Sequence, residues 1–333
     1  MKLQKETIDT IIELKQLGFS SREISKQLNV GKSTVNDTYN RYLVGLEEDK
    51  FFANLKYPAD TSYAKPESIH KGKGPRILIL DVETAAAEVL TFGRFKQNIG
   101  QDNILKEGGW LLCACWRWIG EEEVYYTFLT PEEVQKADDS RIIAHLFEEM
   151  QQADAIIAHN AVGFDHKVIQ ARALANNFGA LPSVKVIDTL VMAKKALRLP
   201  SNRLDSIGEY FGLGRKVDTG GIDLWKRVQR GDEDAMLEML VYCKQDVNLL
   251  HDVYLKLRAI GNKANFNAGL YFDDEHKHCP TCGSTCLSTT GREVSTTLSS
   301  FKEIICLSCG SRHRERTTKT TKEDRSKLLS AVK

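Results

Sequence analysis

The run RILILDVET, residues 76–84, constrains the fold of this chain more than any other stretch. Its four consecutive apolar residues predict a buried strand, and two acids, Asp81 and Glu83, follow at the carboxyl end. Side chains two apart on a strand point to the same face. Two such carboxylates repel one another and lose hydration unless a cation lies between them, and hard divalent ions accept carboxylate oxygens readily. The run therefore indicates a metal site, although acids also commonly mark the end of a strand.

Strands and helices alternate after this run, and residues 75–258 read as one domain. Further strands are expected at WLLCACWRWIG, EVYYTFL, DAIIAHN and VKVID, and helices at residues 140–152, at FDHKVIQARALANN and over nearly all of residues 189–257. A strand meander followed by alternating strand and helix is typical of an α/β domain with a mixed sheet.

Two later segments contribute further acids. In HNAVGFD, Asp165 opens a helix, whose N-terminus favours a carboxylate. In YCKQD, Tyr242 and Asp246 are four residues apart on a helix and share one face. Taken singly, Asp165 also fits a simple helix cap, and the second pair also fits a packed tyrosine beside a solvent-facing acid.

Together, DVET, HNAVGFD and YCKQD closely resemble the three motifs of the DEDD superfamily of 3′→5′ exonucleases, which are DxE, HNxxFD and YxxxD. The resemblance covers residues 75–258. A sibling group of that superfamily has a histidine five residues before the last aspartate, where this chain has Val241. Tyr242, four residues before Asp246, matches the tyrosine subclass.

This resemblance implies a ribonuclease-H-like mixed sheet with flanking helices, holding two Mg²⁺ or Mn²⁺ ions. It implies that Asp81 bridges both ions, and that Glu83 and Asp246 bind the ion that activates water. Asp165 would help to hold the other ion, and Tyr242 would orient or deprotonate the water. An in-line displacement would then release a nucleoside monophosphate. The expected substrate-binding residues are Thr84, His159, Asn160 and Phe164, with His159 and Asn160 either shaping their loop or touching substrate.

Residues 1–45 are predicted to form three short helices. Gly18 ends the first, Ser20 and Glu23 fit a capping box for the second, and a turn at Gly31 precedes the third. The stretch SSREISKQLNVGKSTVNDTYNRYL resembles the helix-turn-helix of resolvase- and transposase-type DNA-binding domains. A three-helix packing module with no role in DNA binding is the alternative. The residues expected to contact DNA are Lys32, Ser33, Thr34, Asn36 and Arg41.

Two CxxCG knuckles lie within residues 274–316. Each can present two thiolates to one ion, and together they predict a small zinc ribbon that holds one structural Zn²⁺, with free thiols or a redox pair as the alternative. Cys286 is expected to be a bystander. Arginines just after the second knuckle could engage phosphates, and a protein-docking role is the alternative. The expected zinc ligands are Cys279, Cys282, Cys306 and Cys309.

The remaining segments and the overall composition complete the prediction. Residues 46–74 and 259–273 read as linkers, and residues 317–333 as a basic, flexible tail. The net charge of +1 gives no evidence for nucleic-acid binding by the whole chain. No apolar run reaches the roughly 20 residues that span a bilayer, and the first ten residues, MKLQKETIDT, lack the apolar core typical of a signal peptide, so export is not expected. No membrane association is expected, and the cytoplasm of a bacterium or of a phage-infected host is the expected location.

These observations favour a DNA-directed 3′→5′ exonuclease flanked by two nucleic-acid-binding modules, an arrangement that resembles phage or mobile-element proteins. Its role would lie in DNA replication, proofreading or recombination, with a DNA polymerase or another replication protein as a candidate partner. Three alternatives remain open. They are an RNA 3′ exonuclease, a helix-turn-helix transposase or integrase, and a regulatory DNA-binding protein whose nuclease-like domain is a scaffold.

Overall fold

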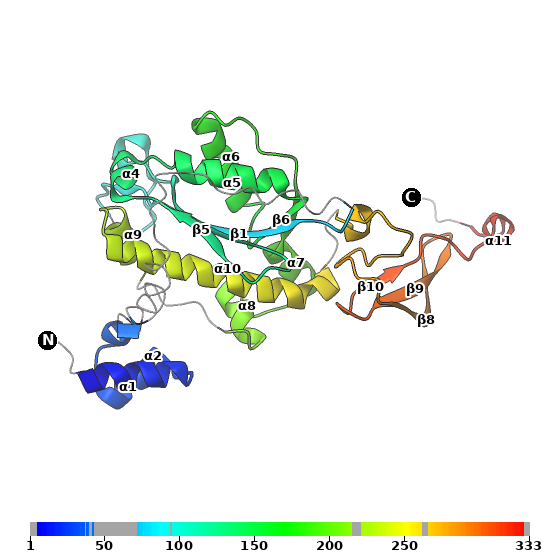
Figure 1. Ribbon diagram of the computed structural model, residues 1–333, viewed down its shortest axis with the longest axis horizontal. Coiled ribbons are helices and arrows are strands. Elements are labelled where there is room, and N and C mark those ends of the chain that lie inside the picture. The colour runs from blue at the N-terminus through cyan, green and yellow to red at the C-terminus, as the bar shows by residue number, and fades with distance from the viewer. Residues whose placement is uncertain are drawn as a thin grey trace.

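A five-stranded sheet lies at the centre of the chain, as the computed structural model shows (Figure 1). The structure describes residues 5–36, 38–39, 42, 72–93, 95–214, 221–261 and 266–329. The strand order in the sheet is β5-β4-β1-β6-β7. In chain order these strands are β1 (Ile77–Thr84), β4 (Leu111–Trp118), β5 (Tyr125–Phe128), β6 (Ala155–Ala158) and β7 (Lys185–Asp188).

The sheet is mixed. β1 pairs antiparallel with β4 and parallel with β6, while β4–β5 is antiparallel and β6–β7 is parallel. β1 therefore has a neighbour on each edge, and Ile77–Leu80 is buried. A strand covered on both faces is apolar without alternation, which explains the uninterrupted run ILIL. The predicted α/β fold with a mixed sheet is confirmed.

Helices cover both faces of this sheet. Figure 1 shows α5 (Ser140–Gln152) and α6 (Asp165–Ala175) on one side and α10 (Glu233–Gly261) on the other. α10 contacts β1, β4 and β5, and it also packs on the shorter helices of its own layer. Buried side chains from both layers and from the sheet form one continuous core. The shorter helices that contact α10 are α7 (Thr189–Ala196), α8 (Leu204–Tyr210) and α9 (Ile222–Val228), and a further short helix, α4 (Pro131–Lys136), follows β5.

The region 189–257 is more divided than the sequence predicts. In the described parts of this region, 189–214 and 221–257, separate helices replace a nearly continuous helical stretch. Pro200 lies in the first break, and a proline disfavours helical backbone in the residue before it. Gly212, Gly214 and Gly231 have positive φ angles and lie in the later breaks. Helical residues need negative φ, so these glycines mark turns that end one helix before the next begins.

The segment between β1 and β4 carries structure that the sequence analysis does not anticipate. It forms a small two-stranded sheet of β2 (Glu88–Val89) and β3 (Ile104–Lys106), with a single 3₁₀ turn, η1 (Gln101–Asn103), just before β3. We call residues 85–110 the arm.

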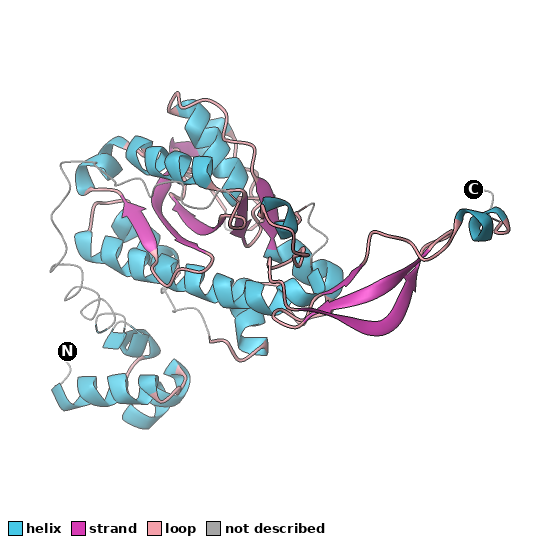
Figure 2. Ribbon diagram, turned by 45° about the vertical axis from the view of Figure 1, so that its right-hand side comes forward, coloured by secondary structure: helices cyan, strands magenta, loops and turns pink. Residues whose placement is uncertain are grey.

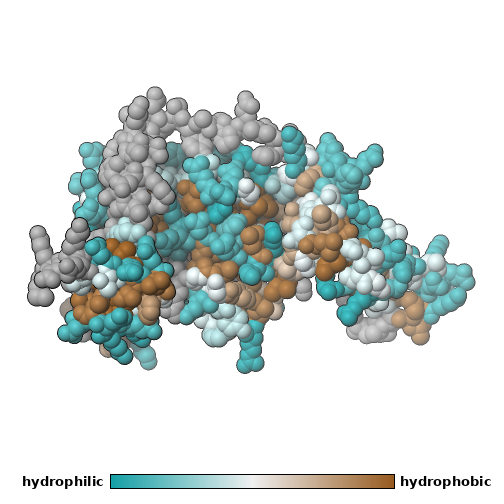
Figure 3. Space-filling view, turned by 60° about the horizontal axis from the view of Figure 1, so that its bottom comes forward, coloured by the Kyte–Doolittle hydropathy of each residue, from teal (hydrophilic) through white to brown (hydrophobic). Residues whose placement is uncertain are grey.

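The N-terminal region contains α1 (Lys5–Gln16) and α2 (Ser21–Leu28), and residues 32–36 are helical. The expected capping box is present, since Ser20 accepts from the backbone of Glu23 and the Glu23 carboxylate accepts from the backbone of Ser20. Ile11, Ile24 and Val35 form a small separate core. Figure 3 shows polar and apolar surface interspersed over these helices, toward the left of that view.

The expected DNA-contacting face needs one correction. Lys32 and Ser33 are exposed and Thr34 is half-buried, but Asn36 is buried and accepts a hydrogen bond from the Ser21 hydroxyl. Asn36 therefore joins the helices to one another and does not lie on an exposed face. Arg41 lies outside the described residues.

After α10 come a 3₁₀ turn, η2 (Ala268–Tyr271), and a three-stranded sheet that extends away from the end of α10 (Figure 2). The predicted tail is not free of structure, since the Lys319 backbone N–H donates to the Ser300 carbonyl in this sheet. Among the described residues, none of the helices combines the length and apolar character needed to cross a bilayer. The elements of this region are β8 (Leu287–Ser295), β9 (Ser300–Cys306), β10 (Arg312–Arg314) and α11 (Lys322–Ser326).

Candidate active site

Three carboxylates meet where β1 faces α10. Asp81 and Glu83 lie on one face of β1, and Asp246 lies on α10, with only 1% of its surface exposed. One oxygen from each of these side chains lies within 4.8 Å of the others. Oxygens at such spacing suit a hard divalent cation. Among the described residues, this is the acidic cluster with the geometry of a metal site.

The fourth predicted acid, Asp165, adjoins this cluster but is not one of the three. It opens α6 and is 2% exposed. Its carboxylate accepts hydrogen bonds from the backbone N–H groups of Asp165 and Val82, and Val82 lies between Asp81 and Glu83 on β1. Four acids were expected around one point. Asp81, Glu83 and Asp246 meet there, and Asp165 lies beside β1, next to them.

Burial and mutual repulsion set the charge state of these acids. Desolvation raises the pKa of Asp81 well above its ordinary value, and the neighbouring Cys243, Glu83, Asp246 and Asp165 raise it further. Burial also raises the pKa of Asp165 to about 7, although its backbone hydrogen bonds oppose that rise. Ionised acids in such a place need compensating positive charge, so this donor set fits a divalent cation.

A family model described as the RNase_H superfamily matches residues 106–258. The match includes the segments that carry Asp165, Tyr242 and Asp246, and it agrees with the mixed sheet flanked by helices. This domain is ribonuclease-H-like. β1, with Asp81 and Glu83, precedes the matched range, and pairing with β4 and β6 places it at the centre of the same sheet. No curated protein matches the chain.

Tyr242 precedes Asp246 by one turn of α10, so the phenol and the carboxylate share a helix face in the ribonuclease-H-like domain. Trp225, which the sequence analysis did not single out, supports this corner of the site. Its indole N–H donates to the carbonyl of Thr84 at 3.1 Å, and its ring packs edge-on against Tyr242 at 6.2 Å between centroids. Trp225 thus joins the end of β1 to the tyrosine.

The loop before Asp165 is held by Asp188, which the sequence analysis also missed. The Asp188 carboxylate accepts from the backbone N–H groups of Asn160 and Val162, both at 3.1 Å. It also caps α7, where it accepts from the backbone of Leu190 and Val191. An aspartate between a strand and a helix, as in VIDTL, is a recognisable capping signal. Its second role, toward the loop, depends on the parallel pairing of β6 and β7.

His159 shapes this loop and has little freedom to bind substrate. One ring nitrogen lies 2.9 Å from the Thr189 hydroxyl, and the other lies 2.9 Å from the carbonyl of Asn202. Asn160 has a φ of 79° and accepts through its carbonyl from Gly163 and Phe164, so it forms the turn. Of the substrate-binding residues expected in this loop, Phe164 keeps a partly exposed ring, at 39%.

Behind the carboxylates lie three buried thiols. Cys243 on α10 donates to the Asp81 carbonyl at 3.5 Å, and its sulfur is 3.8 Å from an Asp81 carboxylate oxygen. Cys113 and Cys115 on β4 pair in register with Glu83 and Asp81 and contact Cys243. Their convergence behind Asp81 follows from sheet pairing and was not visible in the sequence.

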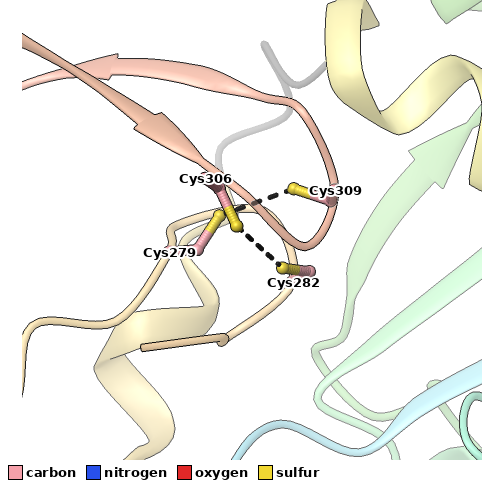
Figure 4. Close-up of side chains that lie close together, drawn as sticks. All are labelled: Cys279, Cys282, Cys306 and Cys309. Carbon is pink, nitrogen blue, oxygen red and sulfur yellow. Dashed lines mark hydrogen bonds between the residues drawn. The ribbon is translucent and has the colours of Figure 1, made fainter. Parts of the chain in front are cut away.

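The two cysteine knuckles also meet (Figure 4). Sγ atoms of Cys279 and Cys309 are 3.7 Å apart, as are those of Cys282 and Cys306, and all four lie within 4.8 Å of one another. Cys286 is exposed and outside this set. Although burial opposes it, hydrogen bonds from neighbouring side chains and backbone N–H groups lower the pKa of Cys279 to about 5. Burial raises the pKa of Cys282 and of Cys309. Four converging cysteine side chains fit a tetrahedral zinc ion, which binds them as thiolates.

Proposed function

We propose that this protein is a metal-dependent 3′→5′ exonuclease that hydrolyses phosphodiester bonds at DNA 3′ ends. The observation that carries this proposal is the convergence of Asp81, Glu83 and Asp246, with Tyr242 one turn before Asp246 on the same helix. A ribonuclease-H-like domain suggests nuclease chemistry in general. The three motifs resembling the DEDD superfamily supply the 3′→5′ direction.

The residues present fit two divalent ions, Mg²⁺ or Mn²⁺. Asp81, Glu83 and Asp246 would hold them, with Asp165 completing the set beside β1. When bound, such ions neutralise the charge that develops on a phosphodiester during in-line displacement. Tyr242 orients the attacking water from the neighbouring turn of α10. Trp225 and Asp188 hold the tyrosine and the Asp165 loop in place.

Two flanking regions extend the proposal. The helices before residue 45 would contact duplex DNA through Lys32, Ser33 and Thr34. One Zn²⁺ would be held by Cys279, Cys282, Cys306 and Cys309.

The choice of DNA over RNA rests on the N-terminal helices. Digestion of matched 3′-labelled DNA and RNA oligonucleotides decides it, since faster loss of label from RNA would contradict the DNA assignment.

Alanine substitutions at the acids test the proposal. We expect Asp81→Ala and Asp246→Ala to slow release of nucleoside monophosphates by about 10³-fold or more, because charge stabilisation by held metal contributes several kcal/mol. Tyr242→Phe should slow it less, by about 10²-fold, since only the orientation of water is lost. The measurement is hydrolysis of 3′-labelled single-stranded DNA by the purified full chain.

The matched control is Asp252→Ala, which removes an exposed acid from the same helix and should leave the rate unchanged. Circular dichroism establishes that each variant is folded. Near-normal hydrolysis by folded Asp81→Ala protein would refute the assignment.

A further inference from the structure

The arm, residues 85–110, has a rigid stem that begins where the catalytic strand ends. Gln229 makes two hydrogen bonds of 2.9 Å to Ala86, one to its N–H and one to its carbonyl. The Ala85 N–H donates to the Trp110 carbonyl at 2.8 Å. A side chain on Gly108 would lie 2.5 Å from the backbone of Ala87, so the two sides of the stem pack backbone to backbone.

Antiparallel pairing of β2 with β3 extends the stem away from β1. Glu88 pairs with Lys106 and Val89 with Ile104. One step further, the Leu90 N–H donates to the Asn103 carbonyl at 2.8 Å. The arm therefore leaves the ribonuclease-H-like domain as a hydrogen-bonded hairpin whose base adjoins Thr84, the last residue of β1. The hairpin is therefore attached to the domain beside the candidate site.

The tip of the arm exposes large apolar side chains. Phe92 is 107% exposed, Phe95 is 84% exposed and Leu90 is 64% exposed. Local polar contacts shape the tip without covering the rings, since the Thr91 hydroxyl donates to the Gly93 carbonyl and the Gln97 amide to the Phe95 carbonyl. Grouped aromatic side chains with this exposure mark an interaction surface.

Charge and position favour a nucleic acid as the occupant. Residues 89–100 contain two basic side chains and no acidic one. Aromatic and basic residues that alternate in the sequence suit unpaired bases, whose faces stack on aromatic side chains while phosphates meet positive charge. The stem is attached to Thr84, which directly follows Glu83 of the carboxylate cluster.

We propose that Phe92 and Phe95 form a stacking platform for single-stranded nucleic acid, which holds unpaired bases of the strand whose end lies at the carboxylates. This inference rests on the proposed nuclease function and assigns contact with the strand beyond its cleaved end to the tip of the arm.

Paired substitutions at both phenylalanines test the ring requirement. We expect Phe92→Ala with Phe95→Ala, and Phe92→Leu with Phe95→Leu, to weaken binding of a fluorescently labelled single-stranded oligonucleotide by about tenfold. Phe92→Trp with Phe95→Trp should bind at least as tightly as the parent, because tryptophan keeps the flat face. Tyr210→Ala, which removes an exposed ring from α8, is the matched control and should bind normally.

All variants are made in the full chain carrying Asp81→Ala and are compared by fluorescence anisotropy on single-stranded DNA and on blunt duplex of the same sequence. Weakening confined to the single strand supports the platform. Normal single-strand binding by the alanine pair overturns it, and so does binding by the leucine pair equal to the parent, which would indicate a general apolar surface. A change of oligomeric state in the alanine pair, measured by light scattering, also overturns it in favour of self-association.

The two proposals fail separately in this design. If the chain with its native Asp81 does not cleave, but binding in the Asp81→Ala series depends on the two rings, the nuclease function is excluded and the platform remains. If the chain with its native Asp81 cleaves, but binding in the Asp81→Ala series does not depend on the rings, the platform is excluded and the nuclease function remains.

Discussion

At the residue scale, the ionised carboxylates of the candidate site destabilise the folded chain unless a cation lies beside them. Burial raises the pKa of Asp81 and brings that of Asp165 to about 7. The ordinary value for an aspartate is 3.8. Between about pH 4 and about pH 7, the Asp165 carboxyl is protonated in the folded chain and ionised in the unfolded chain. The contribution of Asp165 to stability therefore falls as the pH rises through this range. A divalent cation can replace that proton.

This competition between protons and metal is measurable. We expect Mn²⁺ to raise the melting temperature more at about pH 8 than at about pH 5.5, by at least about 2 °C, because protons hold the acids neutral at the lower pH. The measurement is thermal unfolding with and without Mn²⁺ at both pH values. In Asp165→Asn the difference should shrink. An equal gain at the two pH values would contradict a cation held by these acids.

At the element scale, a buried ion pair joins α6 to the start of α5 and to β4. Asp139 is fully buried and accepts two hydrogen bonds of 2.7 Å from Arg172. It also accepts from Asn176 and from the Leu111 backbone. A buried carboxylate with all its bonds satisfied fixes the angle at which α6, and hence Asp165 at its first turn, meets the sheet.

Removing one partner should therefore be costly. We expect Arg172→Ala to lower the free energy of unfolding by about 3 kcal/mol, because the Asp139 charge stays buried without its guanidinium. Arg203→Ala is the control, since Arg203 is largely exposed and lies 3.6 Å from Asp205. It should change stability by less than about 0.5 kcal/mol. Urea unfolding measures both, and equal effects would show that the buried pair does not anchor α6.

The elements differ in how well the sequence predicts them. Apolar runs bounded by polar turns locate β1, β4, β5, β6 and β7, because burial dictates those residues directly. The arm is missed, since its short strands at Glu88–Val89 and Ile104–Lys106 bury little and carry no periodicity. Asn36 is misplaced for a related reason, because a polar side chain can be buried when a partner such as Ser21 satisfies it.

The same distinction holds in the candidate site. Spacing within one strand or helix predicts that Asp81 joins Glu83 and that Tyr242 joins Asp246. The role of Trp225 and the contact of Asp188 with the loop before Asp165 depend on distant elements, so nothing local in the sequence reveals them. Only the capping of α7 by Asp188 has a local signal.

At the scale of the whole molecule, the cysteine knuckles pack onto the ribonuclease-H-like domain. Phe272 stacks on His278 at 3.8 Å, and a side chain on Gly74 or Gly283 would collide with its ring. Lys73 bridges to Phe272, so the segment entering β1 pairs with the base of the knuckles. The predicted linker before residue 274 is thus partly a packed connection. Tyr254 of α10 is buried close to the cysteines, and burial raises its pKa to about 12.

Loss of the proposed zinc should therefore destabilise the part of α10 around Tyr254. We expect Cys306→Ser to lose about one equivalent of bound zinc and to speed hydrogen exchange around Tyr254, because the knuckles that cover this turn lose their cross-link. Metal analysis and hydrogen–deuterium exchange measure the two effects. Cys286→Ser removes an exposed thiol outside the cluster and should change neither. Unchanged exchange in a zinc-free Cys306→Ser protein would show that the knuckles do not support the helix.

The measurement that tests the central claim most directly is a time course on a 5′-labelled single strand of DNA with Mg²⁺. If Asp81, Glu83 and Asp246 hold catalytic metal at a 3′ end, the full-length band shortens stepwise into a descending ladder. The same reaction with excess EDTA leaves the strand intact. Immediate release of the labelled 5′ nucleotide, internal cuts without a ladder, or no cleavage by folded, Mg²⁺-supplied protein would contradict the account.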